Sequence, residues 1–101
     1  MFIYNVTIKI NDSIHDTWLR WMKEKHIPEV MSKNCFTECR MVRLLDIDDS
    51  EGPTYAMQYS ANTRDDYERY IEVYSPALRK DLIDKWGNNF VAFRSLMEVV
   101  N

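Results

Sequence analysis

The spacing of hydrophobic residues switches between two periods along this chain, and this constrains the fold more than any other feature. Apolar side chains alternate over residues 2–10, which predicts a strand. From Ile14 they recur at helical spacing until Pro28 interrupts the pattern, so we expect the first helix to kink or stop there. Residues 35–47 and 54–60 then predict two strands of a long antiparallel hairpin, joined by an acidic turn.

A second helix is predicted after this hairpin. It begins at Thr63, whose spacing to Asp66 is that of a capping box, and ends at Gly87. Pro76 is expected to kink this helix, with the preceding serine as a fresh N-cap. Residues 90–100 predict the fourth strand.

The resulting order is β-α-β-β-α-β over 101 residues. A chain of this length forms one domain, so we expect residues 1–101 to fold together. Two interleaved β-α-β units give an α+β, ferredoxin-like fold: a four-stranded antiparallel sheet with both helices on one face.

The strands predict apolar side chains on both faces of this sheet. In the fourth strand Phe90 and Leu96 point to one side, and Val91 and Phe93 to the other. Two helices can cover only one face, and monomers seldom expose apolar patches larger than a few hundred Å². We therefore expect a homodimer, with a second copy covering the open sheet face.

Charge and composition exclude several classes of protein. Thirteen basic and sixteen acidic side chains give a net charge of −3 and an isoelectric point near 5.3, which argues against binding to nucleic acid. No stretch approaches the roughly 18 apolar residues of a membrane span, and no leader is evident, so a cytoplasmic location without membrane contact is expected. Cys35 and Cys39 lack companion ligands at zinc-site spacing, so no metal is expected.

Two residues are candidates for catalysis. Pro28 would present His26 at a helix break, and histidine suits proton transfer near neutral pH; the alternative is a helix-end histidine that stabilises the helix dipole. Arg94 lies on an apolar strand face, where a guanidinium needs a carboxylate, a carbonyl or an anionic ligand. A structural ion pair with Glu98 on the same face is the expected arrangement.

Aromatic residues from the two helices could line a ligand pocket over the sheet. Such walls with a few polar tips suit an apolar ligand, and they suit a packed core equally well. The candidates are Trp18, Trp21, Tyr67, Tyr70 and Tyr74.

Five stretches spread over the chain form a recognisable pattern: Tyr4-Asn5-Val6-Thr7, Trp18-Leu19-Arg20-Trp21-Met22-Lys23 running into His26-Ile27-Pro28, Arg43-Leu44-Leu45, Thr54-Tyr55-Ala56-Met57-Gln58-Tyr59, and Phe90-Val91-Ala92-Phe93-Arg94. This pattern resembles an uncharacterised bacterial family of about 100 residues in the dimeric α/β-barrel superfamily. The resemblance implies a homodimer of ferredoxin-like subunits and implies no reaction.

The wider superfamily includes antibiotic-biosynthesis-type and haem-degrading monooxygenases and proteins similar to muconolactone isomerase. The resemblance implies a ligand pocket between the helices and the sheet. The haem degraders combine a helix-two histidine with a strand-one asparagine, and Asn5 occupies the latter position here. The second helix has no histidine, so haem chemistry does not carry over and no cofactor is expected.

Three functions follow from this reading. The first is a dimeric small-molecule-binding or regulatory module without catalysis. The second is a cofactor-independent enzyme, similar to a monooxygenase or isomerase, acting on a small hydrophobic or aromatic molecule through His26 or Arg94. The third is RNA binding through an open sheet bearing Tyr4, Tyr55 and Tyr59, against which the acidic charge argues.

Overall fold

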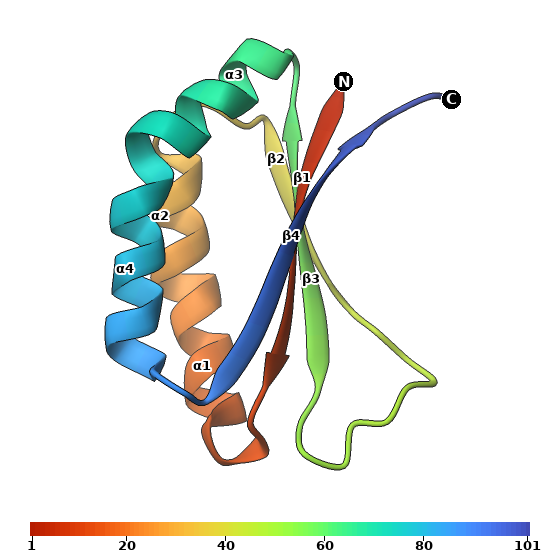
Figure 1. Cartoon of the computed structure of the whole chain (residues 1–101), viewed down its shortest axis with the longest axis vertical. Helices are drawn as coiled ribbons and strands as arrows, with labels where there is room; N and C mark the ends of the chain where they lie inside the picture. Colours follow the sequence, from red (N-terminus) through yellow and green to blue (C-terminus); the bar gives the residue numbers. More distant parts are fainter.

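The computed structural model describes residues 1–101 as a four-stranded antiparallel sheet with both long helical segments on one face (Figure 1). The strand order is β2-β3-β1-β4, which confirms the ferredoxin-like prediction. All three pairings are antiparallel. The strands are β1 (Phe2–Ile10), β2 (Glu38–Arg43), β3 (Thr54–Ala61) and β4 (Phe90–Glu98).

Each long helical segment contains a π-helical turn. The first runs through η1 (Asp12–Ile14, a 3-10 turn), α1 (His15–Trp21), η2 (Met22–His26, the π turn) and α2 (Ile27–Met31). The second runs through α3 (Arg64–Arg69), η3 (Tyr70–Tyr74, the π turn) and α4 (Ser75–Trp86). None of these helices has the length and hydropathy needed to cross a membrane.

The two prolines mark these π turns and do not end the helices. Pro28 and Pro76 both lie in the first turn of the α-helix that follows a π turn. A proline is tolerated there because its missing N–H lacks a regular partner, and the wider turn relieves the ring's clash with the preceding backbone. Ser75, expected as an N-cap, instead donates its hydroxyl to the carbonyl of Ile71 at 2.7 Å.

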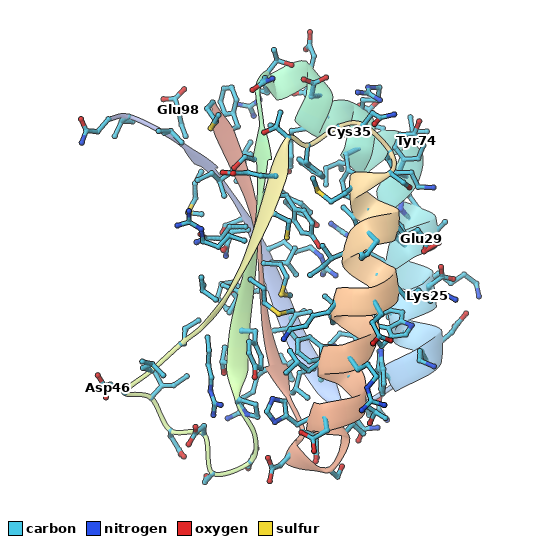
Figure 2. The ribbon with its side chains drawn as sticks, turned by 180° about the vertical axis from the view of Figure 1, so that it is seen from behind. Lys25, Glu29, Cys35, Asp46, Tyr74 and Glu98 are labelled. Atoms are coloured by element: carbon cyan, nitrogen blue, oxygen red, sulfur yellow. The ribbon has the colours of Figure 1, made fainter.

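The helix-facing side of the sheet forms the core. Along β1 it presents Tyr4, Val6, Ile8 and Ile10, all buried, as the alternation predicts. Trp18, Met22 and Val30 of the first helical segment and Leu78 and Leu82 of the second are buried above it. Figure 2 shows that side chains fill the layer between the helices and the sheet.

The opposite face of the sheet is open and more polar than the sequence suggested. Its centre carries Asn5 on β1 and Gln58 on β3, which are cross-strand partners. Only β4 carries an apolar strip on this face, defined by Val91, Phe93 and Met97, which are 72%, 63% and 37% exposed, with Ser95 between the last two. The expectation of an apolar open face is therefore correct for β4 and wrong for the centre of the sheet.

Strand β2 is shorter than the predicted 35–47. Before it, Phe36 is buried and packs on the rings of Tyr4 and Tyr59, at centroid distances of 6.1 and 5.2 Å. After Arg43 the chain leaves the sheet, and Asp46 adopts a positive φ of 59°. Phe36 is therefore hydrophobic because it packs at one end of the core. The sequence pattern alone could not distinguish this from a residue of a strand.

Candidate functional site

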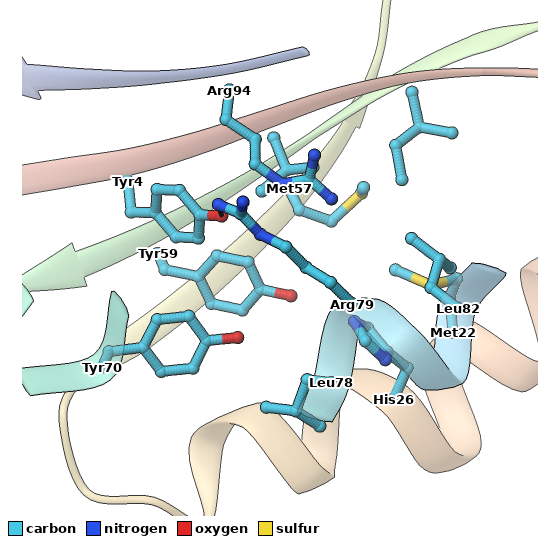
Figure 3. A pocket seen from close by; sticks show the side chains of 12 residues that line it. Tyr4, Met22, His26, Met57, Tyr59, Tyr70, Leu78, Arg79, Leu82 and Arg94 are labelled. Atoms are coloured by element: carbon cyan, nitrogen blue, oxygen red, sulfur yellow. Dashed lines mark hydrogen bonds between the residues drawn. The ribbon is translucent and has the colours of Figure 1, made fainter. Parts of the chain in front are cut away.

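A pocket lies between the helices and the sheet, and it is lined from both layers (Figure 3). Its cavity of about 30 Å³ has room for about two water molecules. Nine of its twelve lining residues are hydrophobic. The lining comprises Tyr4, Val6, Ile8, Met22, His26, Met57, Tyr59, Tyr70, Leu78, Arg79, Leu82 and Arg94.

The two π turns place part of this lining. Met22 and His26 are the first and last residues of η2, and Tyr70 is the first residue of η3. A π turn inserts one residue into a helix and so changes which side chains face the sheet beyond it; such turns are frequent at functional sites. Both turns in this chain lie against the same cavity.

Two arginines enter the pocket without a carboxylate partner. Arg94 comes from β4, where it pairs with Val6 and points to the helix side, and Arg79 comes from α4. Arg79 donates from Nη2 to the Tyr4 hydroxyl at 3.3 Å, while its Nε is buried without a partner. The chain's four ion pairs, within 4.0 Å, involve other residues: Arg43–Asp49, Arg64–Glu68, Arg69–Asp66 and Lys80–Asp84.

The expected ion pair between Arg94 and Glu98 is therefore wrong. The register explains its absence, because Glu98 pairs with Phe2 at the far end of β1, where the side chain is exposed. Sharing a face of a strand does not bring residues four positions apart into contact, since the strand rises about 3.3 Å per residue.

His26 presents a neutral imidazole to the pocket. Its ring stacks on Trp21, with centroids 4.9 Å apart and 25° between the planes. Burial lowers the pKa of His26 to about 4; the Asp81 carboxylate opposes this shift and Arg94 reinforces it. The Nδ1 atom is buried without a hydrogen-bond partner, so the ring can still donate or accept one bond there.

Three tyrosine hydroxyls add polar tips to the apolar wall. Tyr4, Tyr59 and Tyr70 line the pocket side by side in Figure 3. Burial raises the pKa of Tyr59 and of Tyr70, so both phenols stay protonated. Burial likewise raises the pKa of Cys39, beside Tyr59, to about 11, and the thiol is not a nucleophile at neutral pH.

The structure brings together three of the catalytic and pocket candidates: His26, Arg94 and Tyr70 share the pocket. Asn5 does not, because it points to the open face of the sheet, where its amide donates to Thr7 at 2.9 Å. Tyr4, Tyr55 and Tyr59, which the RNA-binding alternative placed on an open sheet, are buried on the helix-facing side, so that placement is wrong.

The other aromatic candidates belong to the packing around the pocket. Trp18 is fully buried and packs on Tyr55 at 5.4 Å, while Trp21 lies behind His26 and contacts Trp86 edge-on at 5.7 Å. Tyr67 and Tyr74 are partly buried against the core and do not line the cavity.

Sequence reasoning missed Arg79, which resembles an ordinary solvent-facing residue of a helix. One signal was available: it lies beside Leu78 and three residues before Leu82, at the edge of the apolar stripe of α4. Tyr59 and Met57 were assigned to a strand, but not to the face that the pocket uses.

The set of pocket side chains offers donors and positive charge rather than metal ligands. No group of three His, Cys, Asp or Glu side chains lies close enough to hold a metal ion. The two guanidinium groups, the phenols and the neutral imidazole can hold and orient a polar group of a ligand whose remainder contacts Met22, Met57 and Leu78.

Comparison with known proteins gives a family and a fold. The sequence pattern of DUF4286, described as a domain of unknown function, matches residues 1–100. No match is found among curated proteins.

Solved structures share the fold over essentially the whole chain. A protein described as a dimeric ferredoxin-like protein from an uncultured marine organism superposes with a TM-score of 0.76 at 17% identity, covering 99% of this chain and 95% of its own. An ethyl tert-butyl ether D (EthD) family protein from Bacillus halodurans gives 0.68 at 11% identity, covering 99% and 100%. A protein described as an antibiotic biosynthesis monooxygenase gives 0.69 at 11% identity, covering both chains fully. At these identities the likeness establishes the fold alone.

Proposed function

The chain belongs to the DUF4286 family, a domain of unknown function, and we propose that it acts as a homodimeric module that binds a small organic molecule in the pocket between its helices and its sheet. The ligand has an apolar or aromatic body, because most of the pocket lining is hydrophobic.

The observation that carries this proposal is a set of polar atoms that have no partner within the chain. Of the four buried side-chain nitrogens without a hydrogen bond, two belong to pocket residues: Nδ1 of His26 and Nε of Arg79. Leaving a buried polar atom unpaired costs about 1–3 kcal/mol, so such atoms are normally satisfied. A bound molecule would supply their partners.

The proposed dimer rests on the apolar strip of β4, defined above as Val91, Phe93 and Met97. Large apolar side chains that line one strand of an uncovered sheet face indicate an interaction surface. At the polar centre of that face Gln58 is partly exposed, and its amide can bond to the same group of a second copy around a twofold axis. One structural neighbour is itself described as a dimeric ferredoxin-like protein.

A second candidate function is catalysis without a cofactor, of the monooxygenase or isomerase type, on the same small hydrophobic or aromatic molecule. It is supported by His26, which lines the pocket and has an Nδ1 atom without a hydrogen-bond partner in the chain. One neighbour of this fold is described as an antibiotic biosynthesis monooxygenase.

The test is a screen of small aromatic and aliphatic compounds against the ¹⁵N-labelled full chain by two-dimensional NMR. Binding in the pocket should shift the backbone signals of His26, Arg94 and Tyr70, and the ligand should raise the melting temperature. In His26→Phe, which keeps an aromatic ring on Trp21, ligand affinity should fall because the ring nitrogens are gone.

The matched control is Arg20→Gln, a change at an exposed residue of α1 that does not line the pocket. It should leave binding unchanged. Compounds that bind only at the open sheet face, or that bind His26→Phe and wild type alike, would contradict the proposed site. Turnover of a bound compound that His26→Phe abolishes would favour the enzyme.

A further inference from the structure

We infer that the ligand carries an organic oxyanion, a carboxylate or a phosphoryl group, which Arg79 and Arg94 bind together. This inference rests on the proposed binding function and names the chemical class of the ligand in that pocket. Neither arginine has an anionic partner in the chain, and both line the same cavity.

The two side chains reach the cavity from different layers of the fold. Arg94 extends from β4 in the sheet, and Arg79 extends from α4 in the helical layer, and both are partly exposed. Figure 3 shows both guanidinium groups among the pocket side chains, with the Tyr4 hydroxyl next to that of Arg79. An oxyanion in the cavity would therefore meet positive charge on two sides.

The charge balance around the cavity is positive. Two guanidinium groups line it, and no aspartate or glutamate does. Asp81 and Glu98, the acidic residues discussed above, are both exposed, and neither pairs with a pocket arginine. A counter-charge stabilises charges that are partly desolvated by apolar walls, because desolvation penalises an unpaired ion. A bound anion would provide it.

The hydrogen-bonding groups point to the same class of ligand. A guanidinium has five N–H donors and no acceptor, and Arg79 makes one hydrogen bond, to Tyr4. Its Nε, without a partner, lies on the edge that binds a carboxylate in the bidentate arrangement. A cation would leave these donors unpaired, whereas an oxyanion offers only acceptors and also balances the positive charge.

The cavity is large enough for the charged group of a ligand but not for its apolar part. A volume of about 30 Å³ accommodates a group of a few heavy atoms, such as a carboxylate. A larger apolar body must displace neighbouring side chains, and Met22 and Met57, which line the pocket, are unbranched and readily change rotamer. The arrangement thus fits a small acid with an apolar part, rather than a bulky neutral molecule.

The experiment compares matched probes on the full ¹⁵N-labelled chain. The pairs are benzoate against benzamide and hexanoate against hexanamide, with phenyl phosphate and inorganic phosphate as separate arms. Binding is followed through the Nε–Hε signals of the arginines and through dissociation constants. We expect each organic anion to bind at least about tenfold more tightly than its amide, since bonds to charged groups are the stronger ones. Benzoate and phenyl phosphate distinguish a carboxylate from a phosphoryl site.

Variants tie this preference to the two residues. Arg79→Gln and Arg94→Gln should each reduce the preference for the anion over the amide to less than about threefold, while the lysine variants keep part of it through charge alone. Arg20→Gln is the control and should keep the whole preference. Circular dichroism checks that each variant is folded.

The outcomes separate the two proposals. The inference that the ligand is an oxyanion is contradicted if the amides bind in the pocket as tightly as the acids, or if both glutamine variants keep the preference for the acid. The proposed binding function stands in either case. Binding of inorganic phosphate without any organic anion would also overturn the inference. If no probe shifts a pocket signal in the wild type, the binding function and the oxyanion are both contradicted.

Discussion

The imidazole of His26 lies stacked on the indole of Trp21, with 4.9 Å between the ring centroids. The stack buries one side of the imidazole, and burial lowers its pKa to about 4. An exposed histidine has a pKa near 6.5. Between about pH 4 and pH 6.5 the ring is therefore neutral in the folded chain and protonated in the unfolded chain.

This difference makes stability depend on pH through His26. The unfolded state binds the proton first, so the contribution of the neutral ring is fully present above about pH 6.5 and is lost as the pH falls towards 4. The loss amounts to at most about 3 kcal/mol, since each pKa unit corresponds to about 1.4 kcal/mol. Asp81 of α4 and Arg94 of β4 are the charges that act on the ring, in opposite directions.

Urea unfolding of wild type and His26→Gln at pH 7, 5.5 and 4.5 measures the effect. Carboxylates titrate in both proteins, so the difference between the two isolates the histidine. We expect the wild type to lose more stability than the variant over this range, by about 2 kcal/mol. Parallel curves would show that the imidazole is not held neutral in the fold.

Trp18 should be the residue whose truncation destabilises the fold most among the aromatic candidates. It has no exposed surface, and its ring packs on Tyr55. Trp18→Ala removes a large buried side chain, which typically costs about 3–5 kcal/mol of unfolding free energy. Val73→Ala, at a residue 61% exposed, is the control and should change stability by less than about 0.5 kcal/mol.

The two glycines should respond differently to alanine. Gly52 has a φ of 149°, and a Cβ placed there would lie 1.7 Å from the carbonyl oxygen of Ile10, so Gly52→Ala must displace backbone. Gly87 has a φ of 56° and a ψ of −123°, which residues other than glycine rarely adopt, but it has open space around it, so Gly87→Ala carries only this backbone strain, about 1–3 kcal/mol. Thermal unfolding should therefore show a clearly larger loss for Gly52→Ala; equal losses would contradict the close approach.

The proposed dimer predicts a charge-sensitive sheet face. Phe93→Glu places a carboxylate at the middle of the apolar strip of β4 and should shift the chain from dimer to monomer in light scattering coupled to gel filtration. Val73→Glu, an equal change at an exposed position of the helical layer, should leave the dimer intact. A wild-type monomer at micromolar concentration would contradict the assembly.

The strands and helices were predictable because local pattern decides them. Residues 2–10 alternate strictly, and the strand has those bounds; Thr63 accepts the expected capping bond from the backbone N–H of Asp66 at 3.1 Å. The 35–47 prediction failed at its first end because Phe36 is apolar for a tertiary reason, packing on Tyr4, that no period reveals. It failed at its second end because Leu45 and Ile47 are apolar but exposed beyond the sheet.

The pocket was only half predictable for a related reason. His26 and Arg94 stood out because each is a polar residue in an apolar context. Arg79 became part of the site through the extra residue of η3, which changes the rotation of α4, and a helical wheel with a uniform 3.6-residue period does not include that extra residue. Asn5 was assigned to the pocket by analogy with the haem-degrading monooxygenases. Side chains alternate along β1, and this alternation places Asn5 on the open face of the sheet.

The two π turns make the composition of this cavity depend on how the helices are bonded as well as on which residues they contain. If η3 took regular α-helical bonding with the same number of residues, everything downstream would turn by about 100° about the helix axis. Arg79 would then swing away from the cavity and an adjacent side chain would take its place. Deleting one residue of η3 would instead remove the bulge and leave Arg79 facing the cavity, because a π turn accommodates one extra residue. A change that removes the bulge without shortening the chain therefore offers a route by which related chains could exchange one ligand preference for another on an unchanged scaffold.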